Sequence, residues 1–335
     1  MVVVITGASA GVGRATAQAF ANAGACLGLI ARGKDRLNSV VREAEASGVT
    51  AMGVSADVAD AGAIEAAAEE IERNLGPIDV WVNNAMTTVY APFAEINPDE
   101  YRRATEVTYL GCVHGTMSAL KRMEPRNKGS IVQVGSALAY RAIPLQAPYC
   151  GAKFAIRGFT DALRCELAHK RSRVHLTMVQ MPALNTPQFD WGRNKLSRLP
   201  QPVPPIFQPE VAARAIVFAA GARRREVWVG RSTIAAILVN KLAPGLLDDY
   251  LARAGYREQL SARVARSDRD DNLFEPVRGP YGAHGRFDAR ATEFCPALTA
   301  SIFKPYLVAT GAALFVRYLT RNRRRARREA QKRLS

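Results

Sequence analysis

The hexapeptide PYCGAK places Tyr149 four residues before Lys153. On an α-helix, residues at i and i+4 lie on the same face, so the phenol and the ammonium group would lie close together. A free phenol titrates near about 10, and a neighbouring cation stabilises the phenolate and lowers that pKa. The pair could therefore be a general acid/base and the cation that tunes it. It could also be a core tyrosine followed by a solvated lysine, and the spacing alone leaves both interpretations open.

A glycine-rich turn, TGASAGVG, occupies residues 6–13, directly after the apolar run VVVI and before a helical stretch that starts at Arg14. A diphosphate requires a backbone without obstructing Cβ atoms and free N–H groups at the positive end of a helix. At the first strand–helix turn, this pattern favours dinucleotide binding over a glycine-rich helix start that serves packing alone. The residues of the turn expected at the cofactor are Gly7, Ser9, Gly11, Val12 and Gly13.

The charges near this turn indicate which dinucleotide would bind. NAD sites commonly place an acidic residue after the second strand to accept the ribose hydroxyl. Here Arg32 stands at that point in LIARGKDRL, with no acid before Asp35, and Arg14 follows the glycine turn. Guanidinium groups bind phosphate oxygens in a forked geometry. The sequence therefore predicts NADP(H) rather than NAD(H), the alternative being that both arginines are solvated surface charges.

The elements that would position these groups alternate between short apolar runs and Ala-rich amphipathic stretches such as 14–23 and 61–74. The runs are brief and β-branched, as strands covered on both faces are. Such alternation predicts an α/β fold with a doubly wound parallel sheet of about seven strands. The predicted strands are 2–6, 26–31, 50–55, 78–83, 130–135, 174–180 and 226–230.

Beyond the last predicted strand the alternation ends. The proline-rich stretch PQPVPP at 200–205 predicts a surface loop, 233–260 looks helical, and 262–292 is polar and rich in glycine. We therefore predict a catalytic domain at 1–232, an extension at 233–296 that covers the substrate mouth, and an apolar helix with a basic tail at 297–335.

Composition limits the classes of protein to consider. The 335 residues carry a formal charge of +16, but 317–335 alone hold nine Lys/Arg and one Glu, a net +8. The basicity therefore belongs largely to a tail without interleaved aromatics, which does not favour nucleic-acid binding. Five scattered cysteines argue against a disulfide framework and a zinc site. With no secretory pattern before the first strand, we expect a cytoplasmic protein.

The segment 301–319 is apolar, yet only 305–316 are free of charge, whereas a spanning helix needs roughly twenty apolar residues. With the Arg-rich tail, the segment could associate with a membrane surface. It could instead pack on the protein or on a second subunit. Both alternatives remain open.

Five features now occur in order: TGASAGVG, Asp57-Val58 after the third strand, NNAM at 83–86, Ser136, and the pair formed by Tyr149 and Lys153. Together they resemble the classical short-chain dehydrogenase/reductase family over about residues 1–230, including a gap of thirteen residues between the serine and the tyrosine. The resemblance implies a Rossmann-type fold, a small-molecule carbonyl or alcohol substrate and a homo-oligomer.

The resemblance also implies roles for particular residues. Tyr149 would exchange a proton with the substrate oxygen, Lys153 would hold the nicotinamide ribose and lower the phenol pKa, and Ser136 would donate a hydrogen bond to the same oxygen. Ser136 could otherwise be a strand-end cap. Further contacts implied are Asp57 and Val58 at the adenine, Asn83 in the cleft, and Thr186 at the carboxamide or, alternatively, as a helix N-cap.

Three positions depart from the family pattern. Met86 and Ala183 stand where glycines are usual, and Thr108 stands where the family commonly has an asparagine that holds a water connected to the lysine. Threonine offers a hydroxyl but not both an amide donor and a carbonyl acceptor. We expect the relay to persist through Thr108 or a repositioned water.

The sequence thus predicts an NADP(H)-dependent oxidoreductase that interconverts a carbonyl and a secondary alcohol on a fairly apolar small molecule. Two alternatives use the same fold: a catalytically weak cofactor-binding protein, which Thr108 and Met86 would favour, and a membrane-recruited interaction protein acting through its tail.

Overall fold

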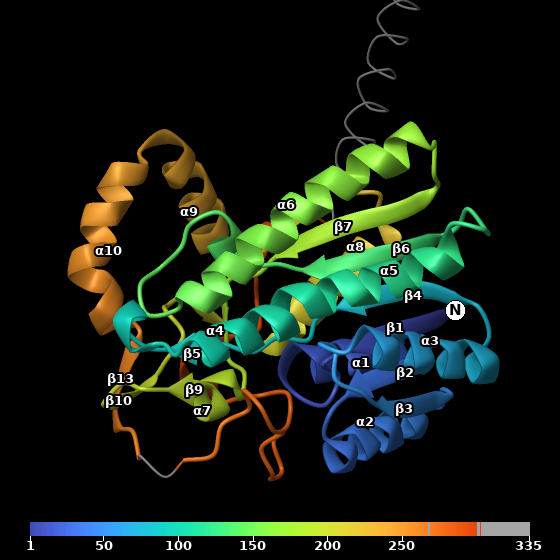
Figure 1. Ribbon diagram of the computed structural model, residues 1–335, viewed down its shortest axis with the longest axis horizontal. Coiled ribbons are helices and arrows are strands. Elements are labelled where there is room, and N and C mark those ends of the chain that lie inside the picture. The colour runs from blue at the N-terminus through green and yellow to red at the C-terminus, as the bar shows by residue number, and fades with distance from the viewer. Residues whose placement is uncertain (267–268, 300–301, 303–335) are drawn as a thin grey trace, which may run out of the picture. The chain divides into compact units, whose positions relative to one another are not determined.

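A parallel sheet of seven strands forms the centre of the computed structural model, which describes residues 1–266, 269–299 and 302 (Figure 1). The strand order is β3-β2-β1-β4-β6-β7-β12, so the chain winds outward in both directions from β1. The strands are β1 (Val2–Thr6), β2 (Cys26–Ala31), β3 (Ala51–Ser55), β4 (Ile78–Asn83), β6 (Gly129–Val134), β7 (Val174–Gln180) and β12 (Glu226–Trp228).

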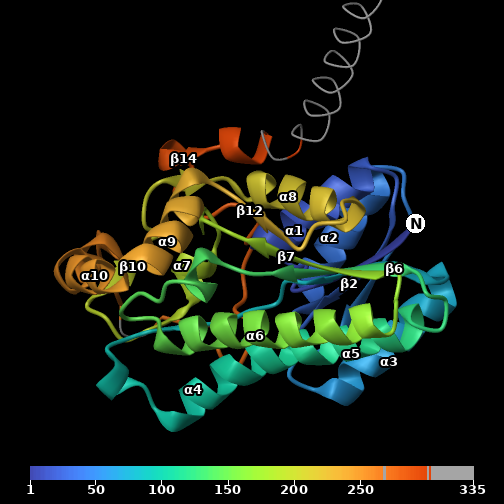
Figure 2. The ribbon, with the colours of Figure 1, turned by 90° about the horizontal axis from the view of Figure 1, so that it is seen from above.

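Helices cover both faces of this sheet (Figure 2). On one face lie α1 (Gly11–Asn22), α2 (Lys34–Ala46) and α8 (Pro209–Gly221), and on the other lie α3 (Ala61–Leu75), α5 (Gly111–Met123) and α6 (Ala147–His169). The short helix α4 (Pro98–Thr105) continues into α5 through a π-helical turn, η2 (Glu106–Leu110). The predicted doubly wound sheet is confirmed.

The strands are apolar on consecutive positions because both faces are buried. Val3, Val4 and Ile5 of β1 have no solvent exposure, and neither has Trp81 of β4. This pattern is the one expected of parallel strands between two helical layers. The carboxyl ends of the strands therefore meet at one edge, where doubly wound proteins bind ligands.

The stretch 233–260, which looks helical in the sequence, contains most of two helices. Gly230, with φ +83°, precedes α9 (Arg231–Leu242), and α10 (Pro244–Glu258) begins after Ala243. Pro244 cannot donate a backbone hydrogen bond and disfavours helical geometry in the residue before it, so the helix is interrupted there. An unexpected strand, β13 (Leu260–Val264), then pairs with β10 (Arg198–Pro200) beside the proline-rich loop.

Short elements connect the later parts of the chain to the sheet's carboxyl edge. They are β5 (Val89–Tyr90) paired with β9 (Arg193–Asn194), β8 (Ala183–Leu184), β11 (Ile206–Phe207) and β14 (Ala291–Thr292) in a second small sheet, α7 (Gln188–Trp191), and the 3₁₀ turns η1 (Phe93–Glu95), η3 (Ala137–Ala139) and η4 (Asp288–Arg290).

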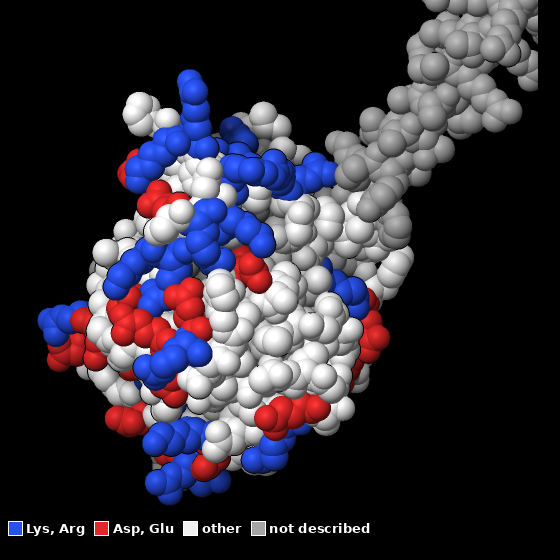
Figure 3. Space-filling view, turned by 90° about the vertical axis from the view of Figure 1, so that its right-hand side faces the viewer, with Lys and Arg blue, Asp and Glu red and all other residues white. Residues whose placement is uncertain are grey.

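Residues Met1–Cys295 form one compact unit, in which the predicted extension packs with the predicted catalytic domain, and Pro296–Ser335 form a second. The apolar segment 301–319 lies outside the described residues except for Ile302. Within the described ranges, no helix combines the length and apolar character that a membrane span requires. On the face shown in Figure 3, basic side chains gather in the upper part, and acidic and basic side chains are mixed below.

Candidate active site

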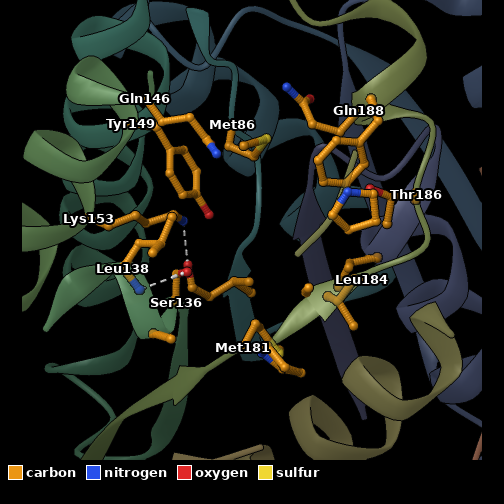
Figure 4. A pocket seen from close by; sticks show the side chains of 18 of the residues that line it. Met86, Ser136, Leu138, Gln146, Tyr149, Lys153, Met181, Leu184, Thr186 and Gln188 are labelled. Carbon is orange, nitrogen blue, oxygen red and sulfur yellow. Dashed lines mark hydrogen bonds between the residues drawn. The ribbon is translucent and has the colours of Figure 1, made fainter. Parts of the chain in front are cut away.

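A cavity of about 880 Å³ lies at the carboxyl edge of the sheet. The glycine turn after β1 lines one end, and the start of α6 lines the middle with Tyr149 and Lys153. Ser136, just after β6, and Thr186, just after β8, lie on opposite sides of it (Figure 4). The structure thus brings residues that are far apart in the sequence into one site.

The glycine turn has the backbone that the sequence suggested. Gly7 and Gly11 have φ values of +66° and +56°, a region that favours glycine. A Cβ on Gly7 would lie 2.7 Å from the Cα of Ala85, and one on Gly13 would lie 2.1 Å from the carbonyl oxygen of Gly7. Gly7, Ser9, Gly11 and Val12 line the cavity, whereas Gly13 allows the close packing of α1 on the turn.

The side chains predicted to carry the chemistry share the middle of the cavity. The phenol oxygen of Tyr149 points into the open space (Figure 4). Lys153 is 2% exposed, and its Nζ donates to the carbonyl oxygen of Val134 at 2.6 Å. Oγ of Ser136 accepts the N–H of Leu138 at 3.1 Å and therefore does cap η3, while the hydroxyl also hydrogen-bonds with Tyr149.

Burial shifts the pKa values of both members of this pair. Burial raises the pKa of Tyr149 well above its usual value, and the hydrogen bond with Ser136 opposes this only in part. The Nζ of Lys153 lies over the ring, 5.4 Å from the centroid. Burial in turn lowers the pKa of Lys153 to about 8. At neutral pH the phenol is therefore a proton donor and the lysine carries its charge.

Three arginines lie near the glycine turn, and the structure separates their environments. Arg32 and Arg36 line the cavity. The Nε atom of Arg36 is buried and has no hydrogen-bond partner. Arg14 lies outside the cavity lining, where it forms an ion pair with Glu43 and donates to Ser39. Arg36 was not selected from the sequence, although its i+4 spacing from Arg32 could have indicated it.

Asp57 and Val58 line the same end of the cavity. Asp57 accepts the N–H of Ala59 at 3.0 Å and pairs with Arg103. Burial alone would raise the pKa of Asp57, but these hydrogen bonds lower it overall, so this carboxylate is ionised.

The two asparagines of NNAM have different roles. Asn83, expected in the cleft, is 5% exposed and does not line the cavity; it accepts from Trp81 at 2.8 Å and donates to Thr116 and Gln133. Asn84 lines the cavity instead, and its Nδ2 donates to the carbonyl oxygens of the glycine turn at Thr6 and Gly7. Successive residues at the end of β4 point to opposite sides, so the core takes the first asparagine.

Thr108 lies in the π-helical turn and is 1% exposed. Its hydroxyl donates to the carbonyl oxygen of Thr87 at 2.9 Å and accepts the N–H of the same residue at 3.0 Å. A hydroxyl has one proton to donate. That proton is committed to Thr87, so Thr108 positions the segment after β4 rather than facing the cavity.

Polar side chains that the sequence did not single out surround the phenol end: Tyr90, Gln146 and Gln188. The remaining wall is mainly apolar and includes Met86 and Ala183, the two positions where glycines were expected. It continues over residues of η3, β8, the proline-rich loop and helices α9 and α10, among them Leu138, Leu184, Val203, Ala236, Leu247 and Leu251.

Fold and cavity together define a doubly wound α/β protein with a site at the carboxyl edge of its sheet, and comparison with known proteins gives the family. A sequence profile described as short chain dehydrogenase matches residues 1–194. The chain is 30% identical over 276 residues to YxnA, an uncharacterized oxidoreductase of Bacillus subtilis, with 82% of this chain and 78% of that one covered. The protein belongs to the short-chain dehydrogenase family.

Other relatives carry more specific names. A 3-dehydrosphinganine reductase of Danio rerio is 31% identical over 224 residues, covering 64% of this chain and 67% of that protein. Among solved structures, an alcohol dehydrogenase of Thermococcus sibiricus complexed with 5-hydroxy-NADP has a TM-score of 0.60 at 26% identity, covering 68% of this chain and 95% of that one. A 3-ketoacyl-ACP reductase of Sinorhizobium meliloti has a TM-score of 0.59 at 25% identity, covering 68% and 97%.

Proposed function

We propose that the protein is an NADP(H)-dependent oxidoreductase that interconverts a ketone and a secondary alcohol on a fairly apolar small molecule. The observation that carries this proposal is the shared cavity, in which the hydroxyl of Tyr149 faces the same space as Ser136, Lys153 and the glycine turn.

The residues present fit a nicotinamide dinucleotide phosphate. Gly7 and Gly11 leave one wall without Cβ atoms, and Arg32 and Arg36 supply cations to that end, with a buried unpartnered Nε on Arg36. Guanidinium groups suit a 2′-phosphate because they bind phosphate oxygens in a forked geometry. Of the three charge-assisted donors of Lys153, one is used on Val134, which leaves the others for a ribose hydroxyl. The cofactor, when bound, supplies or accepts the hydride.

The protein's own groups handle the proton and the developing charge. Because its pKa is raised, Tyr149 holds its proton at neutral pH and can give it to the oxygen of a ketone undergoing reduction. Ser136 receives a hydrogen bond at its Oγ from Leu138, and its hydroxyl proton, which also bonds with Tyr149, can turn to the same oxygen.

The apolar wall supports the proposed substrate class. Side chains such as Leu138, Leu184 and Leu251 line the cavity beyond the phenol, whereas Tyr90 and Gln188 are among the few polar groups nearby. Sites of this composition bind largely apolar molecules oriented by a few hydrogen bonds. Two relatives named as reductases, one of 3-dehydrosphinganine and one of 3-ketoacyl-ACP, agree with an aliphatic ketone.

Titration of the purified protein with NADPH and NADH, followed by nicotinamide fluorescence, tests the cofactor. A series of aliphatic ketones of increasing chain length, assayed with the tighter-binding cofactor, tests the reaction. We expect tighter binding of NADPH and consumption of NADPH with the longer ketones. Tighter binding of NADH would contradict the role of the arginines, and cofactor binding without turnover on any ketone would favour the cofactor-binding alternative.

Two expectations stay predictions from the sequence. They are that the C-terminal segment associates with a membrane surface and that the protein assembles into a homo-oligomer.

A further inference from the structure

A segment near the C-terminal end of the first unit crosses the end of the cavity that the glycine turn and Arg32 line. We call residues 272–282 the strap; it appears in orange to red between α7 and α2 in Figure 1. Two of its residues, Asn272 and Pro276, line the cavity itself. The strap has no regular secondary structure. Its backbone is held by arginine side chains and an N–H group from the segment between the glycine turn and α2.

The strap presents a row of carbonyl oxygens to cationic groups. Arg32 donates to the carbonyl oxygens of Asn272 at 2.5 Å and Phe274 at 2.6 Å. Arg36 donates to those of Val277 and Gly279. These bonds join residues more than 230 positions apart in the sequence, so the strap is bound to the start of α2 by guanidinium groups rather than by strand pairing.

The row of carbonyls continues to the glycine turn. Arg14 donates to the carbonyl oxygen of Tyr281 at 3.2 Å, and the backbone N–H of Gly11 donates to that of Gly282 at 3.1 Å. A backbone N–H has one proton and cannot serve a phosphate oxygen at the same time without sharing it. The strap thus occupies the N–H of Gly11 at the glycine turn, together with Arg32 and Arg36, the cations that the proposed function assigns to the cofactor's phosphate.

The strap is also fastened beyond both of its ends. Before it, Arg269 donates to the carbonyl oxygens of Asp190 and Gly192; after it, Arg286 pairs with Asp190 and donates to Phe189 at 3.1 Å. Between them, the ring of Tyr281 packs edge-on against Trp191, with centroids 4.6 Å apart. All of these contacts are made to α7 or to Gly192, which follows it. The strap therefore joins α7 to the glycine turn and the start of α2 across the cavity.

We propose that the strap gates the cofactor site. In the closed state its carbonyls hold Arg32, Arg36 and the N–H of Gly11, and a dinucleotide phosphate enters or leaves when the strap swings away and releases these donors. The proposal rests on the proposed NADP(H) binding. Lids of this kind commonly control the rate of cofactor or product release.

A disulfide between the strap and α2 tests the gate directly. A Cβ built on Gly33 lies 3.5 Å from the Cβ of Pro276, within the range of about 3.5–4.5 Å found in disulfides. Gly33 has φ −86°, which any residue can adopt. The double variant Gly33→Cys/Pro276→Cys, with the exposed Cys165 changed to serine, would lock the strap when oxidised. Each single variant is a matched control, and mass spectrometry verifies the bond.

The readout is the rate of NADPH binding and release, measured by stopped-flow nicotinamide fluorescence before and after reduction with dithiothreitol. In the oxidised double variant we expect both rates to fall by at least about tenfold and to recover on reduction, whereas the single variants do not respond. An oxidised, verified disulfide that leaves both rates unchanged would overturn the gate.

A loosened strap provides an independent test if the disulfide does not form. The double variant Tyr281→Ala/Arg286→Ala removes anchors that do not line the cavity. NADPH release from it should be about threefold to tenfold faster than from the unchanged protein, and an unchanged release rate would also overturn the gate. Failure of the unchanged protein to bind NADPH or NADH would instead refute the proposed function, so the two failures are distinguishable.

Discussion

Lys153 donates to the carbonyl oxygen of Val134 at 2.6 Å, although it lies one helical turn after Tyr149 on α6. Its ammonium group is therefore fixed at the end of β6, over the tyrosine ring. Burial raises the pKa of Tyr149, so the phenol keeps its proton at neutral pH. The proposed function uses the lysine to hold a ribose and the tyrosine to donate a proton.

Removal of the phenol oxygen should abolish most of the reduction. Tyr149→Phe leaves the ring but removes the proton donor, and general acid catalysis typically contributes about 10²–10⁴-fold. We expect kcat to fall by roughly that factor while NADPH binding persists. Tyr140→Phe is the matched control, because that hydroxyl bonds Glu226 outside the cavity. A Tyr149→Phe protein with more than about a tenth of normal turnover would contradict the assignment.

The pH profile should report Lys153. Because its pKa is lowered to about 8, the ammonium charge is present below that pH and lost above it. We expect kcat/KM for NADPH to decline above about pH 8, since the neutral amine attracts the cofactor less. Lys153→Arg keeps its charge over the whole range and should remove this decline from whatever activity remains. A flat profile in the unchanged protein between about pH 7 and 9.5 would speak against the assignment.

Cofactor preference should depend on Arg36 and Arg32 more than on Arg14. A hydrogen bond to a charged group contributes about 1.5–3 kcal/mol, so each of Arg36→Ala and Arg32→Ala should weaken NADPH binding by roughly tenfold to a hundredfold and NADH binding much less. Arg14→Ala should have a smaller effect, because that side chain is already paired with Glu43. Fluorescence titration with both cofactors measures this. Equal loss of NADH and NADPH binding would exclude a specific phosphate contact.

Thr108 should matter for stability and positioning rather than for proton transfer. Thr108→Val removes the hydroxyl that pairs with the N–H and carbonyl of Thr87, and a buried unsatisfied pair costs about 1–3 kcal/mol. We expect a loss of that size in urea unfolding, with Thr108→Ser close to the unchanged protein. The solvent isotope effect on turnover should stay the same in both variants; a changed effect in Thr108→Val that is absent in Thr108→Ser would restore the relay hypothesis.

Acid should weaken the fold partly through Glu65. Burial would raise the pKa of this carboxyl, but hydrogen bonds from Arg122, Lys121 and Ser118 lower it to about 2. A depressed pKa in the folded state stabilises the protein above the unfolded pKa, and that contribution is lost as the pH falls from about 4.5 towards 2. Glu65→Gln should therefore flatten the acid dependence of the urea midpoint.

The neighbouring substitution Glu69→Gln provides the control for this acid dependence, because Glu69 is 61% exposed and lies 3.9 Å from Lys121. It should behave as the unchanged protein does. Equal flattening in both variants would show that the acid dependence arises from general surface charge.

Local patterns in the sequence were enough to predict the doubly wound sheet. Strands such as β1 and β7 have the predicted bounds because consecutive apolar residues can be buried on both faces only between helical layers. The glycine turn was also predictable from local pattern, because three glycines between the first strand and the first helix indicate a backbone that needs positive φ angles or close contacts. Ser136, Tyr149 and Lys153 were identified by their order and spacing, and the structure places them in one cavity with that turn.

Tertiary structure alone decided which of several similar residues faces the cavity. Asn83 points into the core, whereas the next residue, Asn84, points into the cavity. Arg14 pairs with Glu43 outside the cavity, whereas Arg36 lines it. The strap lies within the extension 233–296 that was predicted to cover the substrate mouth, and its carbonyls bind arginines more than 230 residues away in the sequence. Periodicity and motif spacing report local backbone geometry, whereas such long-range pairings depend on how the finished elements pack.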